Sequence, residues 1–400
     1  MSHKMIDKLL ASYEYKHLSD TYKDAIARLK SLELPNSKQE EYQNTDFSDV
    51  FESVDSIAFE KIGIDYIEND DAHIITVRNN AEDADIDTSI LSVKIVEREN
   101  VGGEEDTISV ISSVLADKSV LISLGDNIKF DKPIIISNQV GTVGSDLYST
   151  NININVGVNS NVQIVVYEEC VHATPLFIGR NSLKLAKNAK ASFCHVVGAN
   201  DAKSLSAIVK QEFMIAENAD LQVFNLSLSG HKCRIESHID IYGKDAHADI
   251  QGIAFLAGNQ LLDNHIYINH LVGNSTSNQL FKYIIDGEAQ GVFSGLINIV
   301  PDAQRVEAFQ RNNNILLTDK AKMHTKPQLI IDADDVKCSH GATTGQIDEQ
   351  ALFYMRSRGI DEQEARAMLI DAFLDEVIVN IAVQQVREQV KSFTNKFFKN

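Results

Sequence analysis

A cysteine and a histidine near the C-terminal end of the chain are the residues best suited to chemistry. Cys338 and His340 stand two positions apart within residues 327–343. If this segment is extended, both side chains project from one face, because strand side chains alternate with a period of two. Thiolate and imidazole are good ligands for iron and for iron–sulfur clusters, and Lys337 is expected to favour the thiolate form of Cys338. A cluster needs about four ligands, so one held here would take the others from elsewhere, most simply from a second subunit.

The other cysteines and two closely spaced histidines fit structural roles better than ligand roles. Cys170 and Cys194 lie in apolar runs, where a buried cysteine behaves as a small hydrophobic residue, and Cys233 is expected at a core or turn position. His265 and His270 are five positions apart, which places them on opposite faces of a regular strand. We therefore expect two hydrogen-bonded histidines near turns rather than a metal pair.

Common motifs for hydrolysis and nucleotide binding are missing from the sequence. It has no GxSxG, no phosphate-binding GxxxxGK(S/T), no HExxH and no GxGxxG. Asp332, Asp334 and Asp335 offer the paired carboxylates that an enzyme would need, but acidic residues in a solvated turn are the simpler interpretation. We therefore expect this chain to lack nucleotide hydrolysis of its own.

Strand patterns dominate the middle of the chain, from residue 119 to about residue 331. Polar and apolar residues alternate there, and few helical segments separate the runs. A weak repeat recurs at roughly 27 to 30 residues, in which an Asn or Asp and a small residue precede each alternating run. A period in this range is typical of a β-solenoid, with a β-sandwich as the alternative. The repeats begin at Asn159, Asn188, Asn218 and Asp245.

Helical patterns flank the strand region on both sides. Before Pro35, apolar residues recur at three- and four-residue spacing, beginning with Ile6, Leu9 and Leu10. Near the other end, Asp348 is suited to cap a helix. We expect an N-terminal helical domain over residues 1–90, a β-helix core over residues 91–345 and a C-terminal helical domain over residues 346–400.

Composition narrows the class of partner. The chain has 400 residues, 44% of them hydrophobic, and a formal net charge of −20. A surface of that sign repels phosphate backbones and anionic lipid, so nucleic-acid and membrane-surface binding are not expected. The four cysteines are scattered, no apolar run reaches 18 residues, and residues 1–15 lack a signal-peptide core. We therefore expect a cytoplasmic protein.

The C-terminal third of the sequence resembles a known family. Residues 327–360 read PQLIIDADDVKCSHGATTGQIDEQALFYMRSRGI, and residues 292–317 read VFSGLINIVPDAQRVEAFQRNNNILL. Both stretches are similar to the SufB/SufD family of the SUF iron–sulfur cluster assembly machinery, and DVKCSHGAT resembles its D-type members. Near the N-terminus only part of a family pattern is present, at Lys38, Glu40, Thr45 and Asp46.

The resemblance implies a mainly β fold, a right-handed parallel β-helix flanked by α-helical domains. It also implies a non-catalytic scaffold that pairs with SufB through the end of the β-helix and docks the ATPase SufC through its C-terminal helices. A nascent Fe–S cluster would form at the SufB–SufD interface, with His340 and Cys338 as the ligands from this chain. The partner-binding residues expected on the C-terminal helices are Met368, Leu369 and Phe373.

Two functions of other classes stay open at this point. One is a solenoid enzyme that acts on a carbohydrate or an acyl donor. The other is a purely structural homo-oligomer, in which Cys338 and His340 pack at an interface. A homodimer of the isolated chain, participation of a flavin and the type of cluster are also left open.

Overall fold

A computed structural model places most of the chain. It describes residues 28–29, 31–54, 62–79, 85–97, 106–115, 118–140, 147–170, 176–198 and 205–398. The first expected helices, which contain Ile6, Leu9 and Leu10, lie outside these residues, as does the side chain of Cys170.

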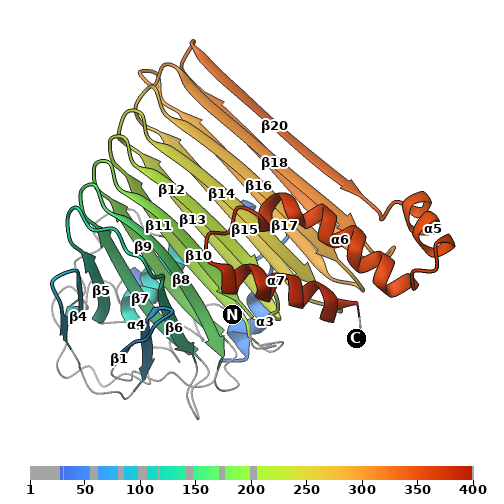
Figure 1. Cartoon of the computed structure of the whole chain (residues 1–400), viewed down its shortest axis with the longest axis horizontal. Helices are drawn as coiled ribbons and strands as arrows, with labels where there is room; N and C mark the ends of the chain where they lie inside the picture. The colour runs from blue at the N-terminus through green and yellow to red at the C-terminus, as the bar shows by residue number, and fades with distance from the viewer. Residues whose placement is uncertain are drawn as a thin grey trace.

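Two large sheets make up the body of the described structure (Figure 1). The first sheet has the order β1 (Ile62–Glu68), β2 (His73–Asn79), β6 (Ile134–Val140), β8 (Asn161–Cys170), β10 (Lys190–Val197), β12 (Asp220–Ser227), β14 (His247–Leu256), β16 (Thr276–Ile285), β18 (Val306–Leu316), β20 (Val336–Gly345). The second sheet has the order β19 (Lys322–Ile331), β17 (Gln290–Ile299), β15 (Leu261–His270), β13 (Lys232–Ile241), β11 (Ala207–Ile215), β9 (Leu176–Leu185), β7 (Leu147–Val156), β5 (Lys118–Leu124), β4 (Leu91–Glu97), β3 (Ile86–Asp87).

Strands that follow one another in the sequence alternate between the two sheets. Thus β10 pairs in parallel with β8 and β12, while β11 pairs in parallel with β9 and β13. Each coil therefore adds one strand to each sheet, which is the connectivity of a β-solenoid and excludes the β-sandwich alternative. Antiparallel pairs β1–β2, β3–β4 and β4–β5 occur only toward the N-terminal end of the described strands.

The repeated Asn or Asp marks a turn in the left-handed backbone region. Asn159, Asn188, Asn218 and Asp245 have φ between 55° and 59°, a conformation that Asn and Asp tolerate better than most residues. The residue that follows each of them is small and fully buried at the corner of the coil. Neighbouring asparagines also bond to each other, since Asn188 Nδ2 donates to Asn159 Oδ1 at 2.7 Å. The sequence repeat therefore identifies the tight corner that lets successive coils stack.

Every second side chain of a strand points inward, and these side chains fill the space between the two sheets. Inward residues such as Ile164, Phe193 and Val223 belong to one continuous apolar core inside the solenoid. Outward apolar residues form separate clusters where helices cover a sheet. The period of two thus gives each strand an inner face for the lumen and an outer face for solvent or a helix.

Helices cover the outer face of each sheet. On the second sheet lie η2 (Glu40–Tyr42), α3 (Ser48–Glu52) and α4 (Thr107–Leu115), and on the first sheet α6 (Glu362–Ile378) and α7 (Gln384–Phe397) lie across the strands (Figure 1). The short α5 (Glu349–Ser357) follows β20. As expected, Asp348 caps α5 by accepting from the Gln350 and Ala351 amides.

The expected helical domain over residues 1–90 does not hold for residues 62–79. These residues form β1 and β2, which extend the first sheet. The apolar residues Ile64, Ile75 and Val77 explain the difference, because they are buried in the core of the solenoid.

Candidate functional site

The C-terminal end of the solenoid presents two open strand edges. β20 is the last strand of the first sheet and β19 is the end strand of the second, so each pairs with a neighbour on one side only. The residues of β20 from Ser339 to Gly345 are all exposed. An edge with unpaired N–H and C=O groups is a template for pairing with another chain. Cys338 and His340 lie on this edge strand.

Cys338 and His340 share the inner face of β20. The pairing of β20 with β18 is continuous and sets Cys338 beside Ala308 and His340 beside Gln310. Ala308 and Gln310 are both buried in the coil below. The pairing of β18 with β20 has no bulge, so side chains two positions apart on β20 point to the same face. The two candidate ligands therefore project in the same direction, as the sequence spacing predicts.

Cys338 is the better shielded of the two candidate ligands. Its side chain is half-buried and packs beside the small apolar cluster that closes this end of the lumen. Burial raises the pKa of the thiol, and a backbone hydrogen bond from Ala308 opposes this only in part. The prediction that Lys337 favours the thiolate form of Cys338 is wrong. Lys337 lies on the opposite face of the strand and pairs with Glu307 at 2.7 Å.

His340 is open to solvent and to an approaching partner. Its side chain is exposed, and the next residue, Gly341, has nothing within 4 Å of where a β-carbon would stand. The exposed imidazole is therefore accessible to a second chain that covers this edge strand.

The two residues form an incomplete donor set. Within the described parts of the chain, no group of three or more His, Cys, Asp or Glu side chains is arranged to hold a metal ion. Cys338 and His340 thus offer two donors of the kinds that iron accepts. Among the residues that the structure describes, no further ligand joins these two.

Cys194, Cys233, His265 and His270 do not join this site. Cys194 and Cys233 are buried, and burial raises the pKa of Cys233 to about 12. His265 faces outward beside Asp263, whereas His270 faces inward, where its ring bonds to two serine hydroxyls. Burial lowers the pKa of His270 to about 4. The two histidines therefore lie on opposite faces, as expected, and make no metal pair.

The acidic residues that an enzyme would need are spread over an exposed turn. Asp332, Asp334 and Asp335 are all exposed between β19 and β20. The backbone of Asp335 is held by the preceding coil, where its N–H donates to Gln304 Oε1 at 2.8 Å. The turn therefore has a structural role in closing the last coil.

Near the N-terminus, the residues that partly match the family pattern lie in a segment that packs against the second sheet. We call residues 34–54 the strap. Thr45 Oγ1 donates to Asp263 Oδ2 at 2.6 Å, and Glu40 pairs with Lys326 at 3.0 Å. The Tyr42 ring lies 4.1 Å from the guanidinium of Arg234. These contacts give the strap a stabilising role that the sequence pattern did not reveal.

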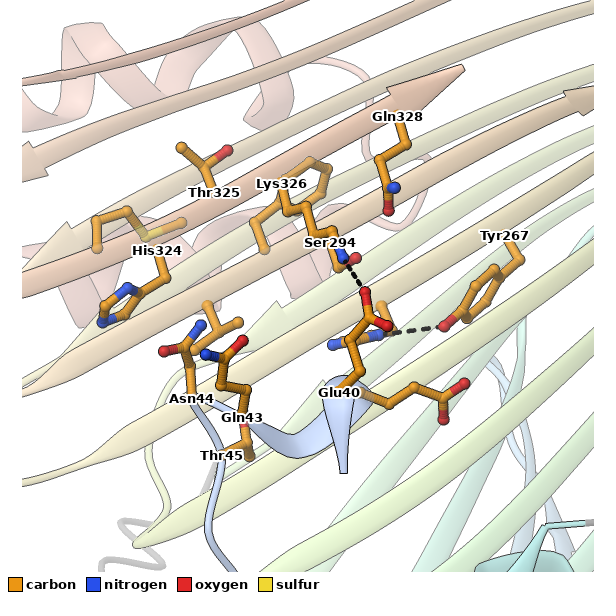
Figure 2. Close-up of a pocket in the computed structure, with 15 residues that line it drawn as sticks. Glu40, Gln43, Asn44, Thr45, Tyr267, Ser294, His324, Thr325, Lys326 and Gln328 are labelled. Carbon is orange, nitrogen blue, oxygen red and sulfur yellow. Dashed lines mark hydrogen bonds and ion pairs between the residues drawn. The ribbon is translucent and has the colours of Figure 1, made fainter. Parts of the chain in front are cut away.

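A depression of about 600 Å³ lies between the strap and the strands β15, β17 and β19. Figure 2 shows Glu40 reaching Lys326 on one wall and the hydroxyl of Tyr267 bonded on another. Its walls carry carboxylates, amides and cations together, so no single charge selects an ion there.

Beneath the strap lies a network of buried charges. Arg234 bonds to Glu236 at 2.6 Å and to Asp263 at 2.5 Å, and Lys210 lies 3.7 Å from Glu236. Burial raises the pKa of Asp263, but Arg234 and His265 outweigh that effect and the net pKa is lowered. Paired charges of this kind fix geometry more than they add stability.

The three residues expected to bind a partner on the C-terminal helices differ in exposure. Met368 is 47% exposed, whereas Leu369 and Phe373 are half-buried against the first sheet. The Phe373 ring lies 4.6 Å from the ammonium of Lys282. Two apolar residues of α5 that we did not single out, Phe353 and Tyr354, are more exposed, at 74% and 59%.

Known proteins match the chain over the solenoid. The family model described as SUF system FeS cluster assembly, SufBD core domain, matches residues 139–373. The iron-sulfur cluster assembly protein SufD of Escherichia coli is 31% identical over 263 residues, which is 65% of this chain and 62% of that protein. The iron-sulfur cluster assembly SufBD family protein slr0076 of Synechocystis is 27% identical over 402 residues, or 91% of this chain and 87% of that protein.

A plant relative is also similar. Protein ABCI7, chloroplastic, of Arabidopsis thaliana is 29% identical over 301 residues, or 70% of this chain and 61% of that protein. The chain thus spans less than two thirds of the Escherichia coli and Arabidopsis relatives. Because the family model covers more than half of its residues, this chain belongs to the SufBD family of the SUF iron–sulfur cluster assembly system, where it is most like SufD.

Proposed function

We propose that this chain is a scaffold subunit that builds an iron–sulfur cluster together with a B-type subunit, SufB, and the ATPase SufC. Cys338 and His340 supply ligands to the nascent cluster, which is the cargo of the complex and not a resident cofactor. The observation that carries the proposal is the place of these two residues, together on the inner face of an exposed edge strand at the end of the solenoid.

The strand edges support pairing with SufB at this end. β19 and β20 each have a free edge, and Ile330 and Ile331 of β19 are 48% and 40% exposed. Unpaired backbone groups give affinity to an added chain, and exposed apolar side chains add burial. A partner that covers this edge would bring its own ligands to the open side of His340.

The C-terminal helices support docking of the ATPase. Exposed apolar residues on α5 and α6, namely Phe353, Tyr354 and Met368, form the apolar surface that such a partner would cover. Because α6 is anchored to the first sheet through Lys282 and Glu376 at 2.8 Å, movement of a docked ATPase would be passed to the solenoid.

The chain acts in this proposal without catalysis of its own, and ATP hydrolysis belongs to SufC. None of the helices in the part of the chain that the structure describes is long and apolar enough to cross a membrane. The described cysteines Cys194, Cys233 and Cys338 are unpaired thiols, which supports the cytoplasmic location that we propose.

Co-expression of this chain with SufB and SufC, followed by anaerobic purification and analysis of iron and sulfide, tests the site. We expect His340→Ala to abolish cluster assembly and to leave the subunits associated. His324→Ala is the matched control, because His324 is half-buried on the outer face of the neighbouring edge strand. A normal cluster yield from His340→Ala would refute the site, and loss of subunit association would show a structural role instead.

A further inference from the structure

The lumen near the candidate site holds two glutamines without bonding partners. Gln279 on β16 and Gln310 on β18 are 2% and 1% exposed. Neither amide nitrogen nor either carbonyl oxygen has a hydrogen-bond partner among the described residues. A buried amide that makes no hydrogen bond costs free energy, so packing alone does not account for two of them together.

The two glutamines stand in one column with His340. Gln279 is paired with Gln310, and Gln310 is paired with His340, in continuous parallel register. Adjacent strands lie about 4.8 Å apart, which is within reach of a glutamine side chain. The three side chains therefore follow one another along the inner face of the first sheet, up to the open end.

The Gln310 amide is directed into the lumen. A β-carbon built on Gly295, in the facing strand β17, would overlap its Nε2 atom. Gln310 therefore extends across the lumen toward β17, and its register partner His340 lies on the next coil.

The two asparagines farther along β18 are already hydrogen-bonded. Asn312 and Asn314 bond to each other at 2.8 and 3.0 Å, and Asn314 also donates to the carbonyl of Thr343. The column below Cys338 contains Ala308, which has no side-chain hydrogen-bonding group. Gln310 thus has a free acceptor and is the residue that the strand register sets beside His340.

Resting on the proposed function, we propose that Gln310 is a positioning residue for His340. When a partner covers the end of the solenoid and one ring nitrogen of His340 binds the cluster, the other ring N–H donates to Gln310 Oε1. Gln310 Nε2 in turn donates to Gln279 Oε1. A second hydrogen bond to a ligating histidine fixes its tautomer and ring orientation and strengthens its binding.

The test compares iron retention with stability in matched variants. The anaerobically assembled complex is treated with an iron chelator, and the rate of iron loss is measured. We expect Gln310→Leu to lose iron about tenfold faster, as for removal of other outer-shell partners. Gln310→Glu should stay close to the parent rate, because a carboxylate accepts the same hydrogen bond.

Gln211→Leu is the matched control deeper in the lumen. Gln211 is fully buried and bonds to Asn225 at 3.1 Å and to Ser237 at 2.7 Å. We expect this variant to lower the thermal unfolding midpoint of the isolated chain and to leave iron loss unchanged. Gln310→Leu should do the opposite, with an unchanged or raised midpoint, because it removes an amide that has no partner.

The results test the positioning role of Gln310 separately from the ligand role of His340. If Gln310→Leu loses iron at the parent rate, or if Gln310→Glu is as impaired as Gln310→Leu, the positioning role is refuted. Should Gln310→Leu fail to fold, Gln279→Leu takes its place, with faster iron loss expected and the parent rate contradicting the inference. A normal cluster in His340→Ala would refute the ligand role of His340 in the proposed function, whereas loss of the cluster there with no effect at Gln310 refutes only this inference.

Discussion

Arg234 and Asp263 lie directly opposite each other on β13 and β15, with Nη1 2.5 Å from Oδ2 and both side chains fully buried. Asp263 also accepts from Thr45, and Arg234 Nη1 donates to the carbonyl of Glu41. One buried ion pair therefore connects the strap to strands whose bonded residues are 193 and 218 positions further along the chain.

Removal of one partner of this pair is expected to destabilise the chain strongly. Arg234→Met leaves Asp263 and Glu236 buried without their cation, so the free energy of unfolding should fall by about 3–5 kcal/mol. Arg78→Met is the control, because Arg78 pairs with Asp65 at the surface with side chains 50% and 45% exposed, and should cost about 1 kcal/mol or less. Urea unfolding measures both, and equal small losses would contradict the structural role of Arg234.

The same network makes the free energy of unfolding depend on pH in the acidic range. Burial raises the pKa of Glu236, but Arg234 and Lys210 outweigh it and lower the pKa to about 2. An unfolded glutamate titrates near about 4.3, so the folded state binds its proton less tightly. The stabilisation is present above pH 4.3 and is lost as the pH falls toward about 2.

A pH series of urea unfolding checks this dependence. We expect stability to decrease between about pH 4.3 and about pH 2 in the parent chain. Glu236→Gln should show a shallower decrease over that interval, because the group no longer titrates. An identical slope in both proteins would mean that other carboxylates govern the acid limit.

Cys338 is expected to react slowly with alkylating reagents at neutral pH. Burial raises the pKa of its thiol, so the reactive thiolate is scarcer than in an ordinary cysteine, whose pKa is about 8.5. The rate of carbamidomethylation should rise with pH, with a midpoint above that value, as mass spectrometry of the Cys338 peptide would show. A midpoint below about 8 would indicate a stabilised thiolate instead.

Substitutions at Met368 and Phe373 should distinguish an effect on partner binding from an effect on stability. Met368 is exposed, so Met368→Glu is expected to reduce capture of the ATPase and to leave the unfolding midpoint unchanged. Phe373 packs over Lys282 and against the first sheet, so Phe373→Ala should cost roughly 2 kcal/mol of stability. Pull-down and thermal unfolding check the two effects, and normal ATPase capture by Met368→Glu would contradict docking at α6.

These point variants are more informative than removal of the helices. The helices α6 and α7 bury outward residues of the first sheet, including Phe224, Ile253 and Phe255. A truncation after about residue 345 would expose this apolar surface and disturb the solenoid as well as any docking. Loss of binding in such a truncation would therefore have two causes.

The sequence by itself determined the local features of this protein. Asn159, Asn188 and Asn218 marked the corners because few residues tolerate their positive φ. The two-residue spacing of Cys338 and His340 was enough to put them on one face, since alternation is a property of any extended strand. Asp348 capped its helix through groups only two and three residues away.

Only the tertiary structure decided which distant residues are in contact and which strands stay exposed. The bond between Thr45 and Asp263 joins residues 218 positions apart, and no local pattern encodes such a distance. The alignment of Gln279, Gln310 and His340 depends on how coils stack, and the exposure of β20 depends on its being the last strand of its sheet. The physical reason is that burial and register are set by neighbours in space, whereas turns, caps and alternation are set by neighbours in the chain.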